Sequence, residues 1–299
     1  MPNDKLKNYL HLHLIVFIWG FTAVLGALIS IDAIPLVWYR MSLATLFIGG
    51  FVIFTKAKLR FSRTTILGFC FAGFLIALHW LTFFGAIKAS NVSITLAVMS
   101  TGAFFNAFLE PLIYLRRIVG YEVLLGVLAM VGVYIIFEVE TQYLTGLLLA
   151  LASSFLGAMF TVINGKYAVK YSAVSITFYE LGFGALCISG YLLYSGDFFS
   201  PEFFVLSTQD WLLLLLLASV CTAYAFIASV HVMKWLSPFT VVLTVNLEPV
   251  YGILLALVIL GDTEQMSAQF YYGAILILLA VLANGFIKIR KSRKRTAKA

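Results

Sequence analysis

Long apolar runs separated by short polar breaks account for almost all of this chain of 299 residues. Most runs are about twenty residues long, the length that an α-helix needs to cross the hydrocarbon core of a bilayer. No polar stretch between them is long enough for a soluble domain. The pattern predicts an all-α polytopic membrane protein of ten transmembrane helices, near residues 11–29, 35–54, 65–86, 92–114, 119–138, 145–168, 174–194, 211–232, 239–260 and 269–287.

The composition supports a membrane protein. Hydrophobic residues make up 62% of the chain, charged residues 11%, and the mean hydropathy is +1.02, outside the range of soluble domains. Cys70, Cys187 and Cys221 all fall inside predicted helices, so we expect neither a disulfide framework nor a metal site. The first helix follows a short polar leader without a convincing cleavage site, so we expect it to be retained.

The charges are segregated between the two sides of the membrane. Apart from Lys88 and Arg40, every Lys and Arg falls in a terminal segment or in loops on one side. The positive-inside bias then predicts that both termini are cytoplasmic. This explains the net charge of +7 better than nucleic-acid binding does, and we expect no nucleic-acid partner. The loops on the other side carry Asp32, Glu138, Glu140, Asp197, Glu202, Asp210, Asp262 and Glu264.

The chain contains an internal repeat. Residues 33–52 align with residues 173–192, so that Arg40 falls on Glu180. Each half holds five helices, an odd number, so the second half enters the membrane from the opposite side. Inverted repeats are typical of secondary transporters, whose substrate site lies near the midplane between the halves. We divide the chain into a first repeat, a second, inverted repeat and a basic cytoplasmic tail, at residues 1–140, 141–287 and 288–299.

Several short motifs carry a resemblance to a known family. They are Trp19-Gly20, Pro35 with Arg40, and the runs Gly126–Val133, Leu236–Thr240 and Glu248–Asp262, followed by Gly273. In their order and spacing the chain resembles the ten-helix EamA-type carriers of the drug/metabolite transporter superfamily, over essentially its whole length. The resemblance implies a carrier of the bacterial cytoplasmic (inner) membrane that exports a small organic solute without a cofactor.

The chain departs from the family pattern at two places. Arg116 and Arg117 stand where such carriers usually have an acidic residue after the fourth helix. Gly102 stands where the first half usually has a mid-helix proline, whereas Pro249 keeps this proline in the second half.

Charged residues within the predicted helices are candidate functional residues, because each costs about 2.5–3.5 kcal/mol at a helix centre. Arg40 lies five residues past Pro35, roughly 7–8 Å along the helix. Two interpretations remain open. Arg40 either lines the outer part of the pathway and binds a carboxylate or phosphate, or extends to the interface as a membrane anchor.

Glu248 is the deepest of the acidic residues, immediately before Pro249. Proline leaves backbone carbonyls free for a ligand or water, and burial favours the protonated form of a carboxyl group. Glu248 is therefore a candidate proton carrier, or else a neutral structural residue. Glu180 is a secondary candidate, near the opposite leaflet from Arg40. Glu110 is expected to pair with Arg116 or Arg117 at the interface.

His79 and Trp80 lie in the middle of the third helix. An imidazole and an indole can hold an aromatic or amine-bearing solute, although the imidazole can equally bond to a neighbouring helix. We add Trp19, Tyr39, Tyr224 and Asn246 as candidate binding residues. His11 and His13 lie two residues apart, on different faces of a helix, so we expect no metal site there.

The leading functional hypothesis is a secondary carrier of an amino acid or a related metabolite that works by alternating access. Its expected partners are the solute, the lipid bilayer and protons, and its oligomeric state is left open. Efflux of lipophilic cations is the alternative within transport. An intramembrane enzyme lacks support, because we find no HExxH, GxSxG or Walker A motif. A lipid scramblase or a scaffold is a further alternative.

Overall fold

The computed structural model describes residues 2–197, 200–232, 235–236, 244–245 and 247–296. These residues form helices and short loops, with no strand among them. The first repeat contains α1 (Pro2–Leu28), α2 (Ala33–Thr55), α3 (Arg63–Ala89), α4 (Val92–Met99), α5 (Gly102–Tyr114) and α6 (Gly120–Val139). After η1 (Thr141–Tyr143), the second contains α7 (Leu144–Ala168), α8 (Ala173–Ser195), η3 (Pro201–Phe204), α9 (Thr208–Ala218), η4 (Ser219–Tyr224), α10 (Ala225–Val232), α12 (Glu248–Ile259), η5 (Gly261–Glu264) and α13 (Ala268–Thr296).

The predicted all-α membrane fold is confirmed. Among the described residues, nine segments are long and apolar enough to cross a membrane, and α12 is a shorter apolar helix. Residues 237–243 and 246 lie outside the described residues, so the first half of the helix expected at 239–260 is largely untested. At the C-terminus, α13 continues to Thr296, through most of the segment expected as a tail.

Two of the expected spans are interrupted. The span at 92–114 divides at Ser100 and Thr101 into α4 and α5, and the span at 211–232 contains the π-helix η4 between α9 and α10. Irregular backbone at membrane depth occurs where it is buried in protein or lines a cavity, and π-helical turns are frequent at functional sites. Both interruptions lie beside the cavity described below, because Ser100 lines it and Thr222 of η4 bonds to a residue of its wall.

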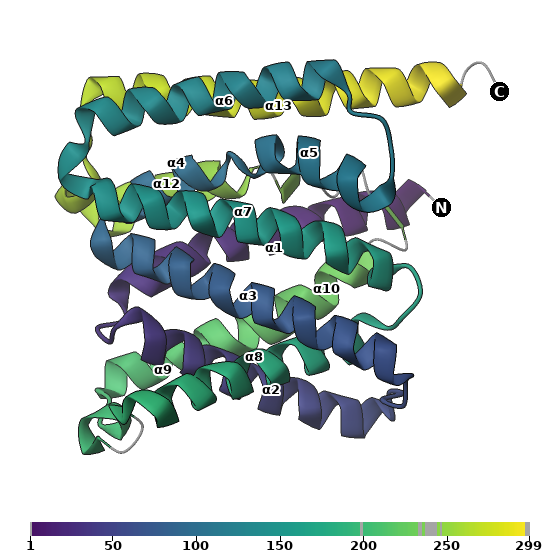
Figure 1. Ribbon diagram of the computed structural model, residues 1–299, viewed down its shortest axis with the longest axis vertical. Helices are drawn as coiled ribbons and strands as arrows, with labels where there is room; N and C mark the ends of the chain where they lie inside the picture. Colours follow the sequence, from purple (N-terminus) through teal and green to yellow (C-terminus); the bar gives the residue numbers. More distant parts are fainter. Residues whose placement is uncertain (1, 198–199, 233–234, 237–243, 246, 297–299) are drawn as a thin grey trace.

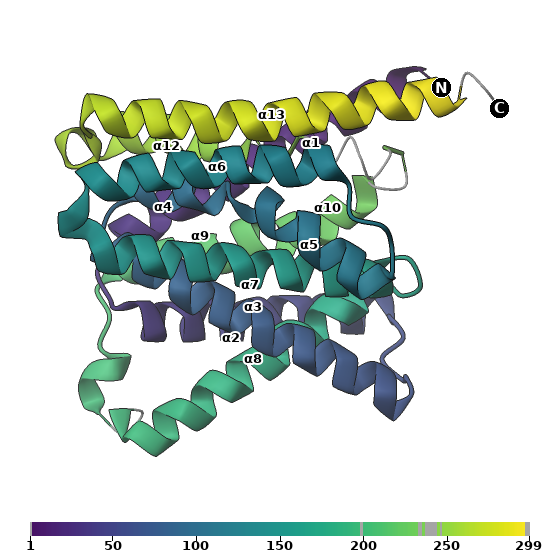
Figure 2. The ribbon, with the colours of Figure 1, turned by 45° about the horizontal axis from the view of Figure 1, so that its top comes forward.

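The start of α1 and the end of α13 lie at the same end of the helix bundle (Figure 1). We call this the terminal end, and it also holds the loops at residues 56–62, 115–119 and 169–172. The loops that join α6 to α7, α8 to α9 and α12 to α13 gather at the other end, which we call the opposite end (Figure 2). The basic loops are therefore at the terminal end and the acidic loops at the opposite end, as the charge pattern predicts.

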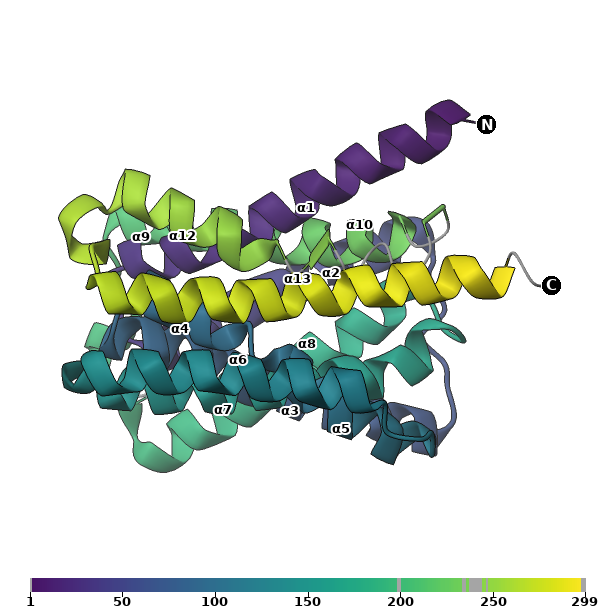
Figure 3. The ribbon, with the colours of Figure 1, turned by 90° about the horizontal axis from the view of Figure 1, so that it is seen from above.

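The last helix of each repeat, α6 and α13, pack against each other along one face of the bundle (Figure 1). Glycine makes this contact close, because a Cβ atom on Gly132 would lie 2.7 Å from the backbone oxygen of Gly273. In the view from above, the first turns of α1 diverge from α13 (Figure 3). Other long contacts join α3 to α7 and α8, and α1 to α12, so helices of the two repeats pack against each other throughout the bundle.

A candidate solute site between the two repeats

A cavity of about 740 Å³ lies between the two repeats. Its wall includes residues of α1 to α6 in the first repeat and of α7, α10, α12 and α13 in the second. At the terminal end the wall reaches Arg116 and Glu122, whereas no described residue of the opposite-end loops belongs to it. The cavity therefore extends from the middle of the bundle to the terminal end.

Arg40 of α2 lies at the inner part of this wall and is 3% exposed. Its Nε donates a hydrogen bond to Oγ1 of Thr222 at 2.9 Å. That hydroxyl donates in turn to the backbone oxygen of Leu217 at 2.7 Å, so the irregular η4 segment holds the acceptor in place. Among the described residues, no carboxylate lies within 4 Å of the guanidinium. The side chain lies inside the bundle and keeps its positive charge beside the cavity.

Two aromatic rings flank Arg40. The guanidinium carbon lies 3.7 Å from the ring centroid of Trp80 and 5.5 Å from that of Phe84. A cation over a ring face is attracted by the quadrupole of the ring, by about 2 kcal/mol when desolvated. Trp80 packs edge-on against Phe226 of α10, which also packs against Trp19. The aromatic residues thus fix the plane of the guanidinium and form an apolar wall around it.

His79 also belongs to the cavity wall, and its imidazole bonds to a neighbouring helix. Nδ1 lies 2.9 Å from the backbone oxygen of Ser153 on α7, and the Ser153 hydroxyl donates to the backbone oxygen of His79 at 2.9 Å. Gly157 on α7 leaves room for the ring, because a Cβ atom there would lie 3.0 Å from it. One nitrogen of His79 is therefore used to join α3 to α7.

Glu248 lies in the wall at the N-terminus of α12. The sequence suggested a proline in the interior of the helix, but Pro249 lies in the first turn of α12, where its missing N–H group breaks no helical hydrogen bond. The free N–H groups at a helix N-terminus favour a negative charge. Arg40 and Glu248 thus present opposite charges to one cavity, without an ion pair within 4 Å between them in the described structure.

The structure places several other predicted residues away from the cavity. Tyr39 turns away from it and donates to the backbone oxygen of Phe203 at 3.1 Å. Tyr224 is 43% exposed and its hydroxyl lies 2.7 Å from Nε2 of His11. Glu180 is buried outside the cavity wall. Of the remaining candidates, Trp19 lines the cavity and Asn246 lies outside the described residues.

Sequence reasoning missed several polar residues of the wall, among them Asn106, Asn284 and Thr22. The side-chain oxygens of Asn106 and Asn284, and Nε1 of Trp19, are buried without a hydrogen-bond partner. Buried polar atoms without partners are rare in proteins and call for a ligand or water. The presence of asparagine within an apolar span is the signal that identifies Asn106 and Asn284.

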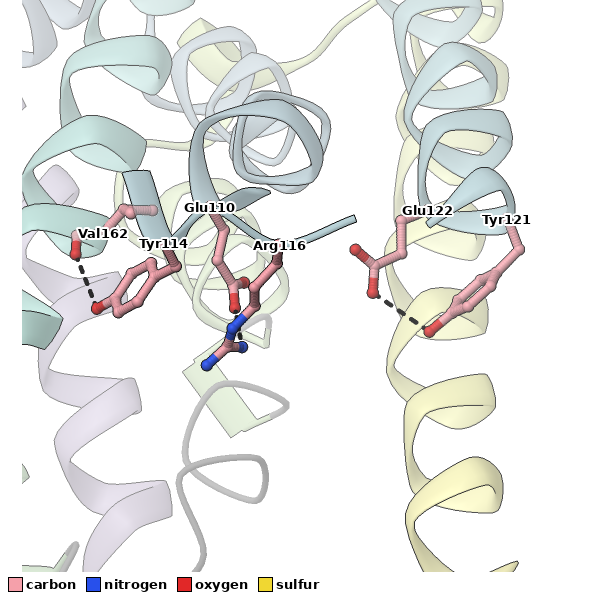
Figure 4. Close-up of polar contacts among 6 residues, drawn as sticks. All are labelled: Glu110, Tyr114, Arg116, Tyr121, Glu122 and Val162. Atoms are coloured by element: carbon pink, nitrogen blue, oxygen red, sulfur yellow. Dashed lines mark hydrogen bonds and ion pairs between the residues drawn. The ribbon is translucent and has the colours of Figure 1, made fainter. Parts of the chain in front are cut away.

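The mouth of the cavity carries exposed charges. Figure 4 shows Arg116 bonded to Glu110 and, across from them, Glu122 accepting a hydrogen bond from Tyr121. The expected interfacial pairing of Glu110 is present, with Nη1 of Arg116 3.0 Å from its carboxylate. The Arg116 side chain is 65% exposed and that of Glu110 41%, so water reaches the mouth of the cavity.

Three buried carboxylates join the two repeats at the opposite end. Asp210 accepts hydrogen bonds from the backbone N–H and the hydroxyl of Ser30, both at 2.7 Å. Glu264 accepts from the N–H groups of Val92 and Ser93, at 3.0 and 2.8 Å, and so caps the N-terminus of α4.

The third of these carboxylates, Glu140, accepts from the hydroxyl of Ser267 at 2.8 Å. All three side chains are at most 4% exposed, and each bonds across the boundary between the repeats. Lys88 adds a hydrogen bond to the backbone oxygen of Ile29 at the same end. These contacts close the bundle at the end away from the mouth of the cavity.

Comparisons with known proteins agree with this architecture. One solved structure, described only as the crystal structure of a protein, is similar to the chain with a TM-score of 0.65 and 14% sequence identity, and the match covers 95% of this chain and 99% of the other. This similarity supports the fold alone. No curated protein matches the sequence.

The match to a family model is more informative. The model of the EamA-like transporter family matches residues 6–138 and again residues 144–286. The two matches correspond to the two five-helix halves of the chain. Together they cover most of its length, and the chain therefore belongs to the EamA-like transporter family.

Proposed function

We propose that this protein is a secondary transporter that exports an amino acid or a related small metabolite by alternating access. The observation that carries the proposal is Arg40, a buried cation beside a cavity and without an acidic partner among the described residues. A planar guanidinium held in one orientation is suited to bind a carboxylate through two parallel hydrogen bonds. The carboxylate of the solute then supplies an anion in direct contact with Arg40, which none of the described residues does.

Glu248 supports the amino-acid assignment, because it offers an acceptor to an ammonium group in the same cavity. A zwitterion placed between Arg40 and Glu248 satisfies both charges. The polar residues Asn106 and Asn284 are then available to the rest of the solute. With the termini on the cytoplasmic side of a bacterial inner membrane, the cavity faces the cytoplasm and is loaded from there.

The proposal is tested by flux of labelled amino acids in liposomes, with wild type, Arg40→Ala and Arg40→Lys. We expect Arg40→Ala to lower flux at least about a hundredfold, because a buried charge-assisted interaction with a ligand contributes about 2–5 kcal/mol. Arg40→Lys keeps the positive charge but loses the planar pair of N–H donors, so we expect its flux to stay well below that of wild type. Arg116→Gln, at the exposed mouth, is the control. Wild-type flux in Arg40→Ala would overturn the assignment.

Proton coupling through Glu248 is the second part of the proposal. Release of the proton frees the carboxylate to bind the solute ammonium, and loss of the solute allows protonation again. Glu248→Gln mimics the protonated form and cannot release a proton, so we expect it to abolish the stimulation of flux by a pH gradient. The measurement compares flux with and without the gradient. Unchanged stimulation in Glu248→Gln would exclude coupling through this residue.

Efflux of lipophilic cations is a second candidate function. Glu248 and the aromatic residues Trp19, Trp80 and Phe226 line the same cavity, a combination that suits an apolar cation. In that case Arg40 is a repulsive neighbour of the solute, and Arg40→Ala raises cation flux instead of lowering it. Measuring the export of amino acids and of lipophilic cations with the same variant therefore separates the two functions.

A further inference from the structure

Glu180 is a buried acidic residue that the cavity does not use. It lies on α8, is 1% exposed, and does not belong to the cavity wall. Nδ2 of Asn164 on α7 donates a hydrogen bond to its Oε2 at 3.4 Å. Burial of a carboxylate among apolar helices is costly unless a cation or several donors compensate it. The compensation for Glu180 therefore requires an explanation.

The charged and titratable groups of the helices packed on α8 do not supply a cation. Arg40 of α2 is directed at Trp80 and Thr222, Cys70 of α3 is a free thiol, and His231 of α10 is exposed. No ion pair joins Glu180 to any described residue. Of the other basic residues on these helices, His79 bonds to Ser153, Lys88 bonds to Ile29, and Lys166 lies against the ring of Tyr114. Arg63, at the start of α3, is exposed.

The unsatisfied atoms at this position are complementary. Oε1 of Glu180 and Oδ1 of Asn164 are both buried and both lack a hydrogen-bond partner. Each is an acceptor when the carboxyl is ionised, so they cannot satisfy each other. A proton on Oε1 turns that atom into a donor and leaves Oδ1 as its acceptor. The amide and the carboxylic acid are then joined by two antiparallel hydrogen bonds.

We propose that Glu180 and Asn164 form a second proton-binding site, separate from the solute cavity. Oε1–H of Glu180 donates to Oδ1 of Asn164, and Nδ2 of Asn164 donates to Oε2 of Glu180. The bound ligand is a proton, and the solute does not contact the site. Neutral Glu180 needs no cation, which accounts for its place among apolar helices.

The packing around the site controls access of the proton. At the contact between α3 and α8, Gly73 lies so close that a Cβ atom there would clash with the backbone of Glu180. Because Glu180 is 1% exposed, water reaches it when α8 separates from the helices packed around it. The proton is therefore held while these helices are packed and is released to water when they separate. The presence of this proton-binding site does not depend on the proposed function. A role of the site in driving solute flux does rest on the proposed function.

The test is the infrared absorption of protonated carboxyl groups in the purified protein in lipid at neutral pH, without solute. Wild type is compared with Glu180→Gln and with the matched control Glu248→Gln. Glutamine mimics the neutral acid and can keep both hydrogen bonds to Asn164, so we expect Glu180→Gln to fold. The expected result is the loss of one protonated-carboxyl band in Glu180→Gln that Glu248→Gln retains.

A spectrum of Glu180→Gln that keeps every protonated-carboxyl band of wild type would overturn the proposal. If Glu180→Gln does not fold, Asn164→Ala gives an independent readout. Removing the amide takes away both hydrogen-bond partners of the acid, so its band must shift in frequency, and an unshifted band overturns the proposal as well. Because no solute is present, either result stands whether or not the protein transports amino acids.

Discussion

The two ends of the bundle differ in the burial and the bonding partners of their charged residues. At the opposite end, Asp210, Glu264 and Glu140 are buried, and each bonds from one repeat to the other. At the terminal end, Glu110 and Arg116 are exposed and pair over six residues within the first repeat. The charged groups that bond from one repeat to the other are therefore buried at the opposite end, whereas the charged pair at the mouth of the cavity is exposed and lies within one repeat.

This difference has an energetic basis. Hydrogen bonds to buried charged groups contribute about 1.5–3 kcal/mol each, whereas an exposed ion pair contributes about 0–1 kcal/mol. Among the contacts of charged groups, those at the opposite end thus contribute most to holding the two repeats together. Opening that end requires the three carboxylates to exchange their partners for water, and an alternating-access cycle must supply this energy through solute or protons. Substitutions at the opposite end should therefore affect stability and the closure of that end more than substitutions at the terminal end.

The largest effect is expected for Asp210→Ala. It removes the acceptor of both bonds from Ser30 and of the bond from the Ser207 hydroxyl. We expect at least about tenfold faster labelling of Val92→Cys, which is 0% exposed at this end, since tenfold corresponds to about 1.4 kcal/mol. The measurement is the rate of reaction with a membrane-impermeant thiol reagent. Asp197→Ala, an exposed residue at the same end, is the control and should leave the rate unchanged.

A smaller effect is expected for Glu264→Gln. The glutamine oxygen can still accept one of the two hydrogen bonds from the N-terminus of α4. Its NH₂ group is a donor and faces the second N–H, so that bond is lost together with the negative charge. We expect a loss of about 1–3 kcal/mol, measured as a lower temperature of thermal unfolding in detergent. Asp262→Asn is the matched control, because Asp262 is exposed two residues away. Equal unfolding temperatures for Glu264→Gln and wild type would mean that this cap does not hold the end closed.

The smallest effect is expected for Arg116→Gln at the mouth. Its exposed pair with Glu110 contributes little to stability, so unfolding temperature should stay close to wild type. Labelling of Val92→Cys should also stay the same, because no bond at the opposite end changes. If Arg116→Gln accelerated this labelling as strongly as Asp210→Ala, the distinction between the two ends would be wrong.

Hydropathy and charge predicted much of the fold, because each is a local property of the sequence. They gave the helical class, most of the spans and the division of basic and acidic loops between the two ends. They did not predict the interruptions at Ser100 and in η4, since each contains only a few small or weakly polar residues within a long apolar run. Nor did they show that Asp210 and Glu264 are buried, because their partners belong to the other repeat, far away in the sequence.

The site was predicted in part for a related reason. The depth of a residue in the membrane follows from its distance to the helix ends. This distance was enough to predict Arg40, Trp80 and Glu248 as site residues. The direction of its side chain depends on how the helix is rotated against its neighbours. Tyr39 and Tyr224 lie at a depth in the membrane similar to that of the predicted site, yet their side chains turn away from the cavity. The repeat aligned Arg40 with Glu180, but only Arg40 belongs to the cavity wall.

The central claim is that one cavity opens at the terminal end while the opposite end is closed. The most direct test places single cysteines in a chain whose three native cysteines are replaced by alanine. Thr161→Cys probes the cavity wall, and Leu36→Cys, 0% exposed, probes the opposite end. With an impermeant thiol reagent on each side of oriented vesicles and no solute, the account predicts that Thr161→Cys reacts only from the side of the termini and that Leu36→Cys is protected. Fast labelling of Leu36→Cys together with protection of Thr161→Cys would contradict it.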